Sequence, residues 1–332
     1  MPKILITTEA LRESSGPHLA KLRAAGLEVG YPAKNVLLTE DEVLAALVGC
    51  VGVIAGSEPY TDRVLAGLPE LRVISRNGVG YDCIDVPACT NRGVVVSITP
   101  EGNHQAVAEH AMALLLAVAR SVVQNANDTR AGNWRRRGVH VPLRGRTLGI
   151  VGLGRIGRSV AIRASAFGMR LVAYEKFPDQ AFVAKYDVEL VDLDTLLAQS
   201  DFVTLHTPMS PETRALINAQ SLAKMKRGSF LINTARGGLV EEQALLDALN
   251  SGHLAGAGLD VLVCEPPPKS HPLVAHPNVV MSPHVSSLDS QAIEDMAAGA
   301  TQNLIDLLGG QWPAASVVNS EVKPRWSERS GD

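Results

Sequence analysis

Short runs of apolar and β-branched residues alternate along the chain with longer stretches of helical periodicity. The first strand is predicted at residues 3–7 and the first helix at residues 17–25. Three more strands, each ending just before a loop that contains glycine or proline, are expected at residues 51–55, 71–75 and 94–96. This alternation predicts a parallel α/β sheet in the first part of the chain.

A second series of strands follows a long helical pattern at residues 103–119. It opens at residues 147–151, and the strands expected to complete a six-stranded dinucleotide-binding sheet lie at residues 171–174, 202–205, 229–232, 256–260 and 279–281. The helix predicted at residues 290–308 follows that sheet and is therefore free to return to the first one. The polar residues 321–332 predict a loosely ordered tail.

Composition narrows the class of protein. Hydrophobic residues make up 46% of the chain and charged residues 20%, which is typical of globular proteins and excludes disorder, collagen and coiled coil. With 31 basic residues against 34 acidic ones, the net charge of -3 gives no basic field that would indicate nucleic acid or an anionic membrane as partner. A small anionic substrate remains compatible with this balance.

The cysteines and the apolar runs favour a cytoplasmic location. The four cysteines show neither C-x-x-C spacing nor the density of a disulfide scaffold. The amino terminus lacks the pattern of a signal peptide, and the longest apolar run, residues 111–119, is shorter than the about 20 residues that span a bilayer. We therefore expect a soluble protein of the reducing cytoplasm.

Residues 152–157 read Gly-Leu-Gly-Arg-Ile-Gly, directly after a predicted strand and before the helical pattern at residues 158–167. In G-x-G-x-x-G the first glycine permits the tight turn, the second lets the backbone approach a pyrophosphate, and the third permits close helix packing. The helix N-terminus adds N–H groups and a positive dipole. An ordinary glycine turn is the alternative interpretation. The predicted cofactor-binding residues of this loop are Gly152, Gly154, Arg155, Ile156 and Gly157.

Glu175 follows the next predicted strand, about 20 residues beyond the first glycine, where an acidic side chain can accept both hydroxyls of a ribose. A carboxylate there would repel a 2′-phosphate and so favours NAD. Lys176 beside it could partly neutralise that repulsion, or it could be an exposed bystander. NADP therefore stays open as an alternative cofactor.

Three polar residues, Arg236, Glu265 and His284, each follow a predicted strand of the second sheet. Carboxyl ends of parallel strands meet at one edge of a sheet, so these side chains are expected to converge beside the nicotinamide. Reduction of a 2-oxo acid needs a cation for the carboxylate and carbonyl, which Arg236 supplies, and a proton donor, which His284 supplies. Glu265 hydrogen-bonded to His284 would favour the imidazolium, raise its pKa and fix the ring. Each residue alone could be a surface arginine, a structural carboxylate or a core histidine.

The chain resembles the D-isomer-specific 2-hydroxyacid dehydrogenases over nearly its whole length, most closely the 3-phosphoglycerate dehydrogenase branch. The segments that carry the resemblance are residues 76–82, 99–103, 149–157, 206–208, 233–238, 257–261, 265–267 and 283–284. It places the family's catalytic arginine, glutamate and histidine on Arg236, Glu265 and His284, and its nicotinamide-amide aspartate on Asp260. Further cofactor contacts are expected from His206, Thr207, Pro208, Thr234 and Ala235; His206 is assigned no proton transfer.

The resemblance also implies an α/β fold of two Rossmann-like or flavodoxin-like domains with parallel sheets and an active-site cleft between them. Residues 1–101 plus 285–332 would form a discontinuous substrate-binding domain, and residues 102–284 the NAD-binding domain, with hinges near Pro100 and Pro283. In this family the long helix and the arm after the first hinge build a dimer interface, so a homodimer is expected. The arginine run after Trp134 would reach toward the other subunit's site or form a solvated basic loop.

The segment Asn77-Gly78-Val79-Gly80 comes directly after a predicted strand, and its glycines let successive N–H groups turn toward an anion. The family uses these amides for the substrate carboxylate. Arg76 matches an arginine of the phosphoglycerate dehydrogenases and suggests a second anionic group on the substrate, or else turns to solvent. Cys83 and residues 286–289 depart from the family's usual residues, so the pocket shape is expected to differ.

The expected function is hydride transfer between NAD and C2 of a short, anionic D-2-hydroxy acid or 2-oxo acid. A 3-phosphoglycerate dehydrogenase-like enzyme is the first hypothesis, and a hydroxypyruvate, glyoxylate or other 2-oxo acid reductase is the alternative. The family also includes NAD-sensing corepressors, a non-enzyme alternative that the full catalytic set disfavours. No metal is expected, because His271 and His276 make a poor ligand set with His284. The chain also ends too early for the family's regulatory domain, so we expect no feedback control through one.

Overall fold

The computed structural model describes residues 1–12, 16–34, 37–134, 138 and 140–324 of the chain. Its contacts divide the chain into two compact units: unit 1 comprises Met1–Asn103 and Leu288–Asp332, and unit 2 comprises His104–Ser287. The arginine run at residues 135–137 and the end of the tail, residues 325–332, lie outside the described residues.

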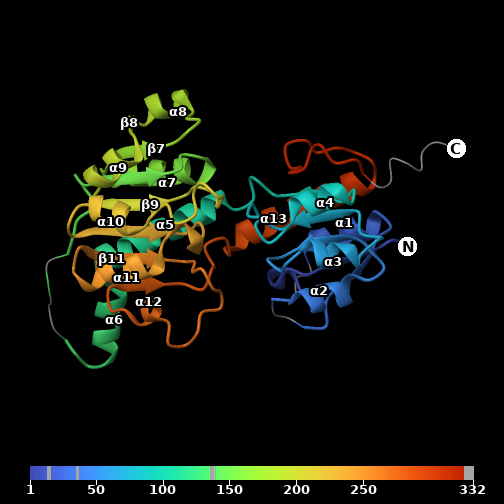
Figure 1. Cartoon of the computed structure of the whole chain (residues 1–332), viewed down its shortest axis with the longest axis horizontal. Helices are drawn as coiled ribbons and strands as arrows, with labels where there is room; N and C mark the ends of the chain where they lie inside the picture. The colour runs from blue at the N-terminus through green and yellow to red at the C-terminus, as the bar shows by residue number, and fades with distance from the viewer. Residues whose placement is uncertain (13–15, 35–36, 135–137, 139, 325–332) are drawn as a thin grey trace. The chain divides into compact units, whose positions relative to one another are not determined.

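Unit 1 is built on a parallel sheet of five strands in the order β2-β1-β3-β4-β5. The strands are β1 (Lys3–Ile6), β2 (Glu28–Gly30), β3 (Cys50–Ala55), β4 (Val73–Arg76) and β5 (Val95–Ser97). Its helices are η1 (Glu9–Leu11), α1 (Pro17–Ala24), α2 (Glu40–Leu47), α3 (Asp62–Ala66), α4 (Val86–Asn91) and α13 (Ser290–Leu308). Figure 1 shows α13, in red, among the blue elements of this unit.

The two faces of this sheet bury alternate residues of each strand. Ile4 and Ile6 pack with α1 and α13, whereas Leu5 packs with α2, α3 and α4 on the other face. Two hydrogen bonds fix α13: Ser75 Oγ donates to Ala300 O (2.8 Å), and the Asn303 side chain donates to Ile98 O (2.9 Å). The prediction that the last helix returns to the first sheet is thus confirmed.

Unit 2 is built on a parallel sheet of seven strands in the order β12-β11-β10-β9-β6-β7-β8. The strands are β6 (Thr147–Val151), β7 (Arg170–Tyr174), β8 (Val188–Leu190), β9 (Phe202–Leu205), β10 (Ser229–Asn233), β11 (Leu254–Leu259) and β12 (Val279–Met281). The helices are α5 (His104–Ala119), α6 (Val122–Arg130), α7 (Arg155–Ala166), α8 (Gln180–Lys185), α9 (Leu193–Gln199), α10 (Ala219–Lys224), η2 (Gly237–Leu239), α11 (Glu242–Asn250) and α12 (Pro272–Ala275).

Helices cover both faces of this second sheet, α5 and α7 on one and α9, α10 and α11 on the other (Figure 1). Neighbouring residues of a strand enter opposite cores: Ile150 packs with α5 and α7, and Val151 packs with α9 and α11. Strands buried on both faces read as continuous apolar runs, which is why the sequence identifies them. All strand pairs are parallel, as the alternation of strands and helices predicts.

Two strands were missed from sequence, and the second sheet has seven strands rather than six. β2 and β8 have three residues each and lie at sheet edges. Each includes an exposed glutamate, Glu28 or Glu189, so neither forms an apolar run. The start of the polar tail also differs from the prediction: Val322 is buried in the core beside α13. Just before it, residues 316–318 pair with the chain at and after β5.

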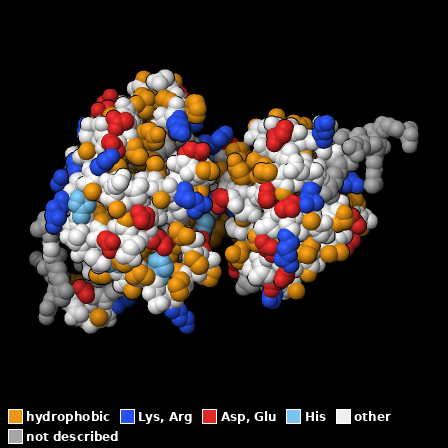
Figure 2. Space-filling view, viewed as in Figure 1, with side chains coloured by type: hydrophobic (Ala, Val, Ile, Leu, Met, Phe, Trp, Pro, Cys, Tyr) orange, Lys and Arg blue, Asp and Glu red, His pale blue; other side chains and the backbone are white. Residues whose placement is uncertain are grey.

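Acidic and basic side chains are mixed over the surface, as their nearly equal numbers in the sequence predict. Figure 2 shows acidic and basic side chains interspersed over the visible face of each unit. Within the described ranges, no single helix combines the length and apolarity needed to cross a membrane; α5 and α6 reach the criterion only when joined across a 62° bend.

Candidate functional site

The glycine loop between β6 and α7 packs so tightly that two of its positions exclude a side chain. Gly152 has φ +94°, and a Cβ there would lie 2.8 Å from the backbone of His206. A Cβ on Gly157 would lie 2.0 Å from the carbonyl oxygen of Gly152. Both contacts involve backbone, which cannot move aside cheaply. The predicted roles in the turn and in helix packing are confirmed for these two glycines.

Gly154, the second glycine of the loop, differs because a Cβ there would meet nothing within 4 Å. It is the N-cap residue of α7, so the open space lies at the helix end that carries the unpaired N–H groups and the positive end of the dipole. A side chain would fill this space without any clash inside the protein. Arg155 and Ile156 form the first turn of α7. The loop therefore fits the pyrophosphate of a dinucleotide.

Glu175 stands directly after β7, beside the glycine loop. One carboxylate oxygen accepts a hydrogen bond from the N–H of Leu153 (2.8 Å) and the other from the N–H of Phe177 (3.0 Å). The side chain thus ties the end of β7 to the loop and fixes its negative charge there. Its predicted contact with the ribose hydroxyls remains a prediction. Lys176 is exposed beside it.

Two buried polar atoms near the carboxyl edge of the sheet have no hydrogen-bond partner among the described residues, Nδ1 of His206 and Oγ1 of Thr234. His206 follows β9, and its Nε2 pairs with Thr204 Oγ1 at 2.8 Å. Thr234 follows β10. Buried polar atoms are nearly always paired, so these two fit a bound molecule with polar groups. Burial lowers the pKa of His206 to about 3, which keeps its ring neutral and unsuited to proton transfer.

The remaining residues expected to contact the cofactor continue the same two loops. Thr207 and Pro208 come directly after His206, at the carboxyl end of β9. Ala235 comes directly after Thr234, and its N–H donates to the Asn233 side chain (3.0 Å). With the glycine loop after β6 and Glu175 after β7, these positions follow four neighbouring strands of one sheet. Such a series of strand ends is where open parallel sheets bind ligands.

His284 and Glu265 form the predicted pair. The imidazole Nδ1 lies 2.6 Å from Glu265 Oε2, and the N–H of Leu262 donates to Glu265 Oε1 at 2.8 Å. The side chains are 39% and 34% exposed, so both are accessible from outside unit 2. Burial raises the pKa of the Glu265 carboxyl, but the hydrogen bond and charge of His284 and the Leu262 N–H outweigh it, so that pKa lies below its usual value. The carboxylate therefore stays charged and holds the ring by Nδ1, which leaves Nε2 for proton transfer.

Arg236 is placed by the loop that follows β10. The Asn233 side chain donates to Arg236 O (2.8 Å) and fixes the backbone there, while the guanidinium donates to Ala235 O (2.7 Å). The next residue, Gly237, approaches the loop that ends at Glu265: a Cβ on it would lie 2.0 Å from the carbonyl carbon of Leu262. This close approach brings the Arg236 loop and the Glu265 loop side by side.

Asp260 is 1% exposed and holds the turn that bears His284. Its carboxylate accepts hydrogen bonds from Ser282 Oγ (2.6 Å) and from the N–H groups of Val285 (3.0 Å) and Ser286 (2.9 Å), and its carbonyl accepts the His284 N–H (2.8 Å). His284 takes φ +55°, a left-handed conformation that costs a non-glycine residue about 1 kcal/mol. These bonds offset that cost. The predicted contact of Asp260 with the nicotinamide amide stays a prediction.

Sequence reasoning missed two residues of this network, Ser282 and His110. Ser282 adjoins His284 in the chain, and that adjacency was the available signal. His110 lies on α5, 172 residues away from Ser282, and nothing in the pattern of that helix sets it apart.

In unit 1 the segment after β4 is only partly open to a ligand. The N–H of Asn77 donates to Ala55 O (2.9 Å) and that of Gly78 to Arg76 O (3.0 Å), so these two amides already have partners. The N–H groups of Val79 and Gly80 have none among the described residues. Of the four amides predicted to bind an anion, those of Asn77 and Gly78 donate within the protein; anion binding by the other two stays a prediction.

Arg76 neither turns to solvent nor presents a free guanidinium. Its Nε donates to Gly80 O (2.9 Å), its Nη1 to the carbonyl oxygens of Ala55 (3.3 Å) and Asn77, and its Nη2 to Ser57 Oγ (3.2 Å). The side chain therefore holds the segment 76–80 against the end of β3. This is a different role from the two that sequence suggested.

His271 pairs with a carboxylate of α11. Its Nε2 lies 3.2 Å from Glu242 Oε2 on α11. Among the described residues, no group of three or more His, Cys, Asp or Glu side chains is arranged to hold a metal ion.

Replacing Glu265 by Gln tests the pair. The carboxylate, which its lowered pKa keeps charged, holds the imidazole by Nδ1, and a neutral amide would hold the ring less firmly. We expect the variant to bind NADH like wild type and to reduce a 2-oxo acid more slowly. The measurements are NADH binding and the reduction rate for both proteins; an unchanged rate would contradict a role of Glu265 in holding His284.

Comparison with known proteins gives the family. The sequence model described as "D-isomer specific 2-hydroxyacid dehydrogenase, NAD binding domain" matches residues 112–286. A glyoxylate reductase of Korarchaeum cryptofilum is 40% identical over 296 residues, which cover 88% of this chain and 87% of that protein. A D-3-phosphoglycerate dehydrogenase of Mycobacterium leprae is 41% identical over 291 residues, 85% of this chain.

The match to the second relative covers 55% of its length, so the chain spans about half of that protein. Among solved structures, the NAD-dependent formate dehydrogenase from Staphylococcus aureus in complex with NAD is 27% identical with a TM-score of 0.85, covering 95% of this chain and 98% of that one. The loop geometry, the strand-end residues and these matches agree. The chain belongs to the D-isomer-specific 2-hydroxyacid dehydrogenase family, and residues 112–286 are its NAD-binding domain.

Proposed function

We propose that the protein is an NAD-dependent oxidoreductase that interconverts a short 2-oxo acid and the corresponding D-2-hydroxy acid. The observation that carries the proposal is the His284–Glu265 pair, 2.6 Å apart, on the same sheet as a dinucleotide-binding loop. An acid–base group held in this way beside a nicotinamide has the chemistry that a carbonyl reduction needs.

In the proposed mechanism the residues of unit 2 bind the substrate and move its proton. When bound, NADH supplies the hydride to C2 of the 2-oxo acid. Arg236 binds the carboxylate and polarises the carbonyl, since a guanidinium pairs with planar oxygen groups. His284 donates a proton from Nε2 to the C2 oxygen, while Glu265 holds Nδ1 and stabilises the charged ring. In the reverse direction His284 accepts that proton.

NAD rather than NADP is the cofactor that we propose for this chain. Both oxygens of Glu175 are bonded to backbone N–H groups, so the carboxylate is held in place at the end of β7. A fixed negative charge at that position repels a 2′-phosphate. Comparing oxidation of NADH and NADPH on the same substrate measures the preference.

We propose further that the substrate carries no phosphate. Arg76 is the cation that would bind one, yet its Nε, Nη1 and Nη2 already donate to oxygens of unit 1. Glu58, buried at 2% exposure in the adjoining loop after β3, adds a carboxylate that would disfavour a second anion. The amides of Val79 and Gly80 suit the single carboxylate of a small acid such as glyoxylate or hydroxypyruvate.

The variant Arg76→Lys separates the two substrate classes. Lysine cannot reproduce the fork of hydrogen bonds that holds segment 76–80. We expect kcat/KM for hydroxypyruvate and for phosphohydroxypyruvate to fall in parallel, each about tenfold. A loss confined to the phosphorylated substrate would show that Arg76 binds the phosphate and would favour a 3-phosphoglycerate dehydrogenase.

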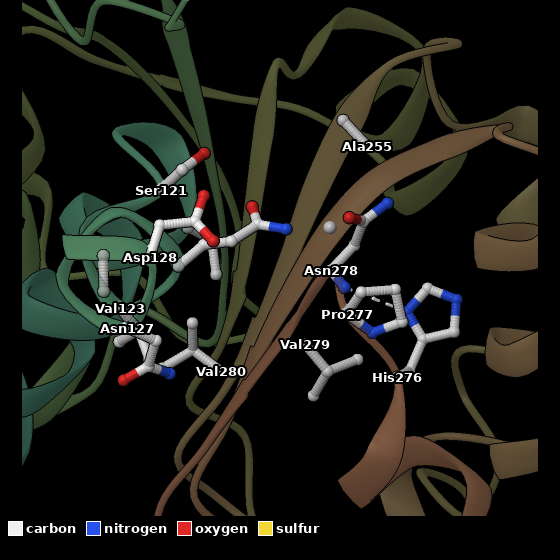
Figure 3. Close-up of a pocket in the computed structure, with 14 residues that line it drawn as sticks. Ser121, Val123, Asn127, Asp128, Ala255, His276, Pro277, Asn278, Val279 and Val280 are labelled. Carbon is white, nitrogen blue, oxygen red and sulfur yellow. Dashed lines mark hydrogen bonds between the residues drawn. The ribbon is translucent and has the colours of Figure 1, made fainter. Parts of the chain in front are cut away.

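A second copy of this chain is the partner that we propose. Helix α6 has no buried residue, and Val122 and Val123 are 53% and 45% exposed. Beside it lies a cavity of about 340 Å³ between the end of α5, α6 and the strands β11 and β12. Asn127 and Asp128 lie on one side of it and His276, Pro277 and Asn278 on the other (Figure 3). Two exposed valines at the start of this helix, beside a hollow, support a protein interface.

The oligomeric state tests this proposal directly. We expect sedimentation to give the mass of two chains, and Val123→Asp to give the mass of one. A wild-type protein that sediments as a single chain at micromolar concentration would contradict the homodimer.

A further inference from the structure

A chain of short hydrogen bonds leads from helix α5 to the turn that bears His284. Nε2 of His110 lies 2.7 Å from Ser282 Oγ, and Ser282 Oγ lies 2.6 Å from Asp260 Oδ1. The ring nitrogen is also 3.5 Å from the same carboxylate oxygen. All three residues belong to unit 2, and none of them touches the His284 ring in any described contact.

The direction of these hydrogen bonds follows from the number of protons available. Ser282 has one hydroxyl hydrogen, and the ionised Asp260 can only accept, so the hydroxyl donates to Asp260. Ser282 Oγ must then accept from the ring, which assigns a proton to Nε2 of His110. The series therefore runs in one direction: His110 Nε2 donates to Ser282 Oγ, and Ser282 Oγ donates to Asp260 Oδ1.

The Asp260 carboxylate lies at the centre of this network. Oδ1 is shared between Ser282 Oγ and the Val285 N–H, and Oδ2 accepts the Ser286 N–H. Any rotation of this carboxylate must therefore break bonds on both sides of His284. The carboxylate is fully buried, so water cannot replace a donor that is lost.

We propose that His110 and Ser282 are positioning residues for the general acid: they fix the Asp260 carboxylate, which holds residues 284–286 in the turn that aims the His284 ring. The His110 ring prevents the Ser282 hydroxyl from turning away from Asp260. The catalytic turn is thus supported by the core helix α5 as well as by its own sheet. The expected loss of kcat rests on the proposed function. The hold on residues 284–286 rests on geometry alone.

The kinetic test uses His110→Leu and Ser282→Ala. Both are assayed with NADH and either hydroxypyruvate or glyoxylate, whichever wild type reduces with the higher kcat/KM. Leucine suits a helix, and both changes leave the pair of His284 and Glu265 intact. A misaimed acid lowers the chemical step, so kcat is expected to fall about tenfold in each variant. Ser282→Ala leaves the buried Asp260 carboxylate one donor short, so its thermal midpoint is expected to fall slightly. The rates are compared at a temperature at which both variants remain folded.

Conservative variants and a matched control separate positioning from general damage. His110→Gln places an amide N–H near the position of Nε2, and Ser282→Thr keeps the hydroxyl, so both are expected to recover most of kcat. Glu109→Gln changes the residue of α5 next to His110. The Glu109 side chain is 65% exposed and pairs with Arg163 on α7. This control is expected to match wild type.

Amide hydrogen exchange gives a readout that does not depend on turnover. We expect the Val285 and Ser286 amides to exchange faster in His110→Leu than in wild type, with the Glu109→Gln control unchanged. Wild-type kcat and exchange in both His110→Leu and Ser282→Ala would overturn the proposal, as would a His110→Gln variant as impaired as His110→Leu. If wild type reduces no 2-oxo acid, the proposed function fails, whereas the exchange data still decide the positioning role.

Discussion

His284→Ala is expected to lose turnover by about a thousandfold while it still binds NADH, because a positioned general acid contributes about 10²–10⁴ in rate. The His284 ring is hydrogen-bonded to Glu265. Without this ring, no other described side chain on the turn that bears residue 284 can donate a proton at neutral pH. Rates at saturating substrate and NADH binding followed by fluorescence are the two measurements.

The control for this variant must show that the fold and the nucleotide loop survive. His276→Ala removes another histidine from the same part of the chain and should turn over normally. The only described hydrogen bond of the His276 side chain is the one that its Nδ1 accepts from the Asn278 N–H (3.1 Å). Turnover of His284→Ala within about tenfold of wild type would contradict its role as the general acid.

Gly157→Ala is expected to abolish NADH binding at concentrations that saturate wild type. Alanine normally stabilises a helix by about 1 kcal/mol relative to glycine. Here its Cβ would lie 2.0 Å from the Gly152 carbonyl oxygen, so α7 must move away from the loop. We expect a lower thermal midpoint together with the loss of binding.

Gly154→Ala is the matched comparison within the same loop. Its Cβ meets nothing inside the protein, so the thermal midpoint is expected to change little. The methyl group would still occupy the space next to the N-terminus of α7 and weaken NADH binding. A Gly154→Ala protein that binds NADH normally would contradict the assignment of this space to the pyrophosphate.

The parts of the molecule that could be predicted from sequence are those that depend on local patterns. Strands such as β6 and β9 are buried on both faces and are therefore mostly apolar in sequence. In the glycine loop a Cβ on Gly152 or Gly157 would clash with backbone, so the G-x-G-x-x-G motif identifies the loop from sequence. The pairing of Glu265 with His284 followed from their positions after neighbouring strands, β11 and β12, of one parallel sheet.

The parts that could not be predicted depend on contacts between distant residues. The Arg76 guanidinium bonds oxygens from two loops, so its role is set by where the β3 loop lies and not by its own neighbours in sequence. His110 meets Ser282 across 172 residues, and no periodicity pairs them. The short edge strands β2 and β8 form because a neighbouring strand offers free backbone groups, despite their polar residues.

Hydride transfer to C2 can be observed directly with NADH that carries deuterium at the transferred position. Wild-type protein is mixed with this cofactor and hydroxypyruvate or glyoxylate, and the product is analysed by mass spectrometry and by its chirality where C2 is a stereocentre. We expect one deuterium at C2 of the product, with the D configuration when hydroxypyruvate is the substrate, and about a thousandfold less product in the same time from His284→Ala. A wild-type protein that binds the cofactor but places no deuterium on any short 2-oxo acid would contradict the proposed activity.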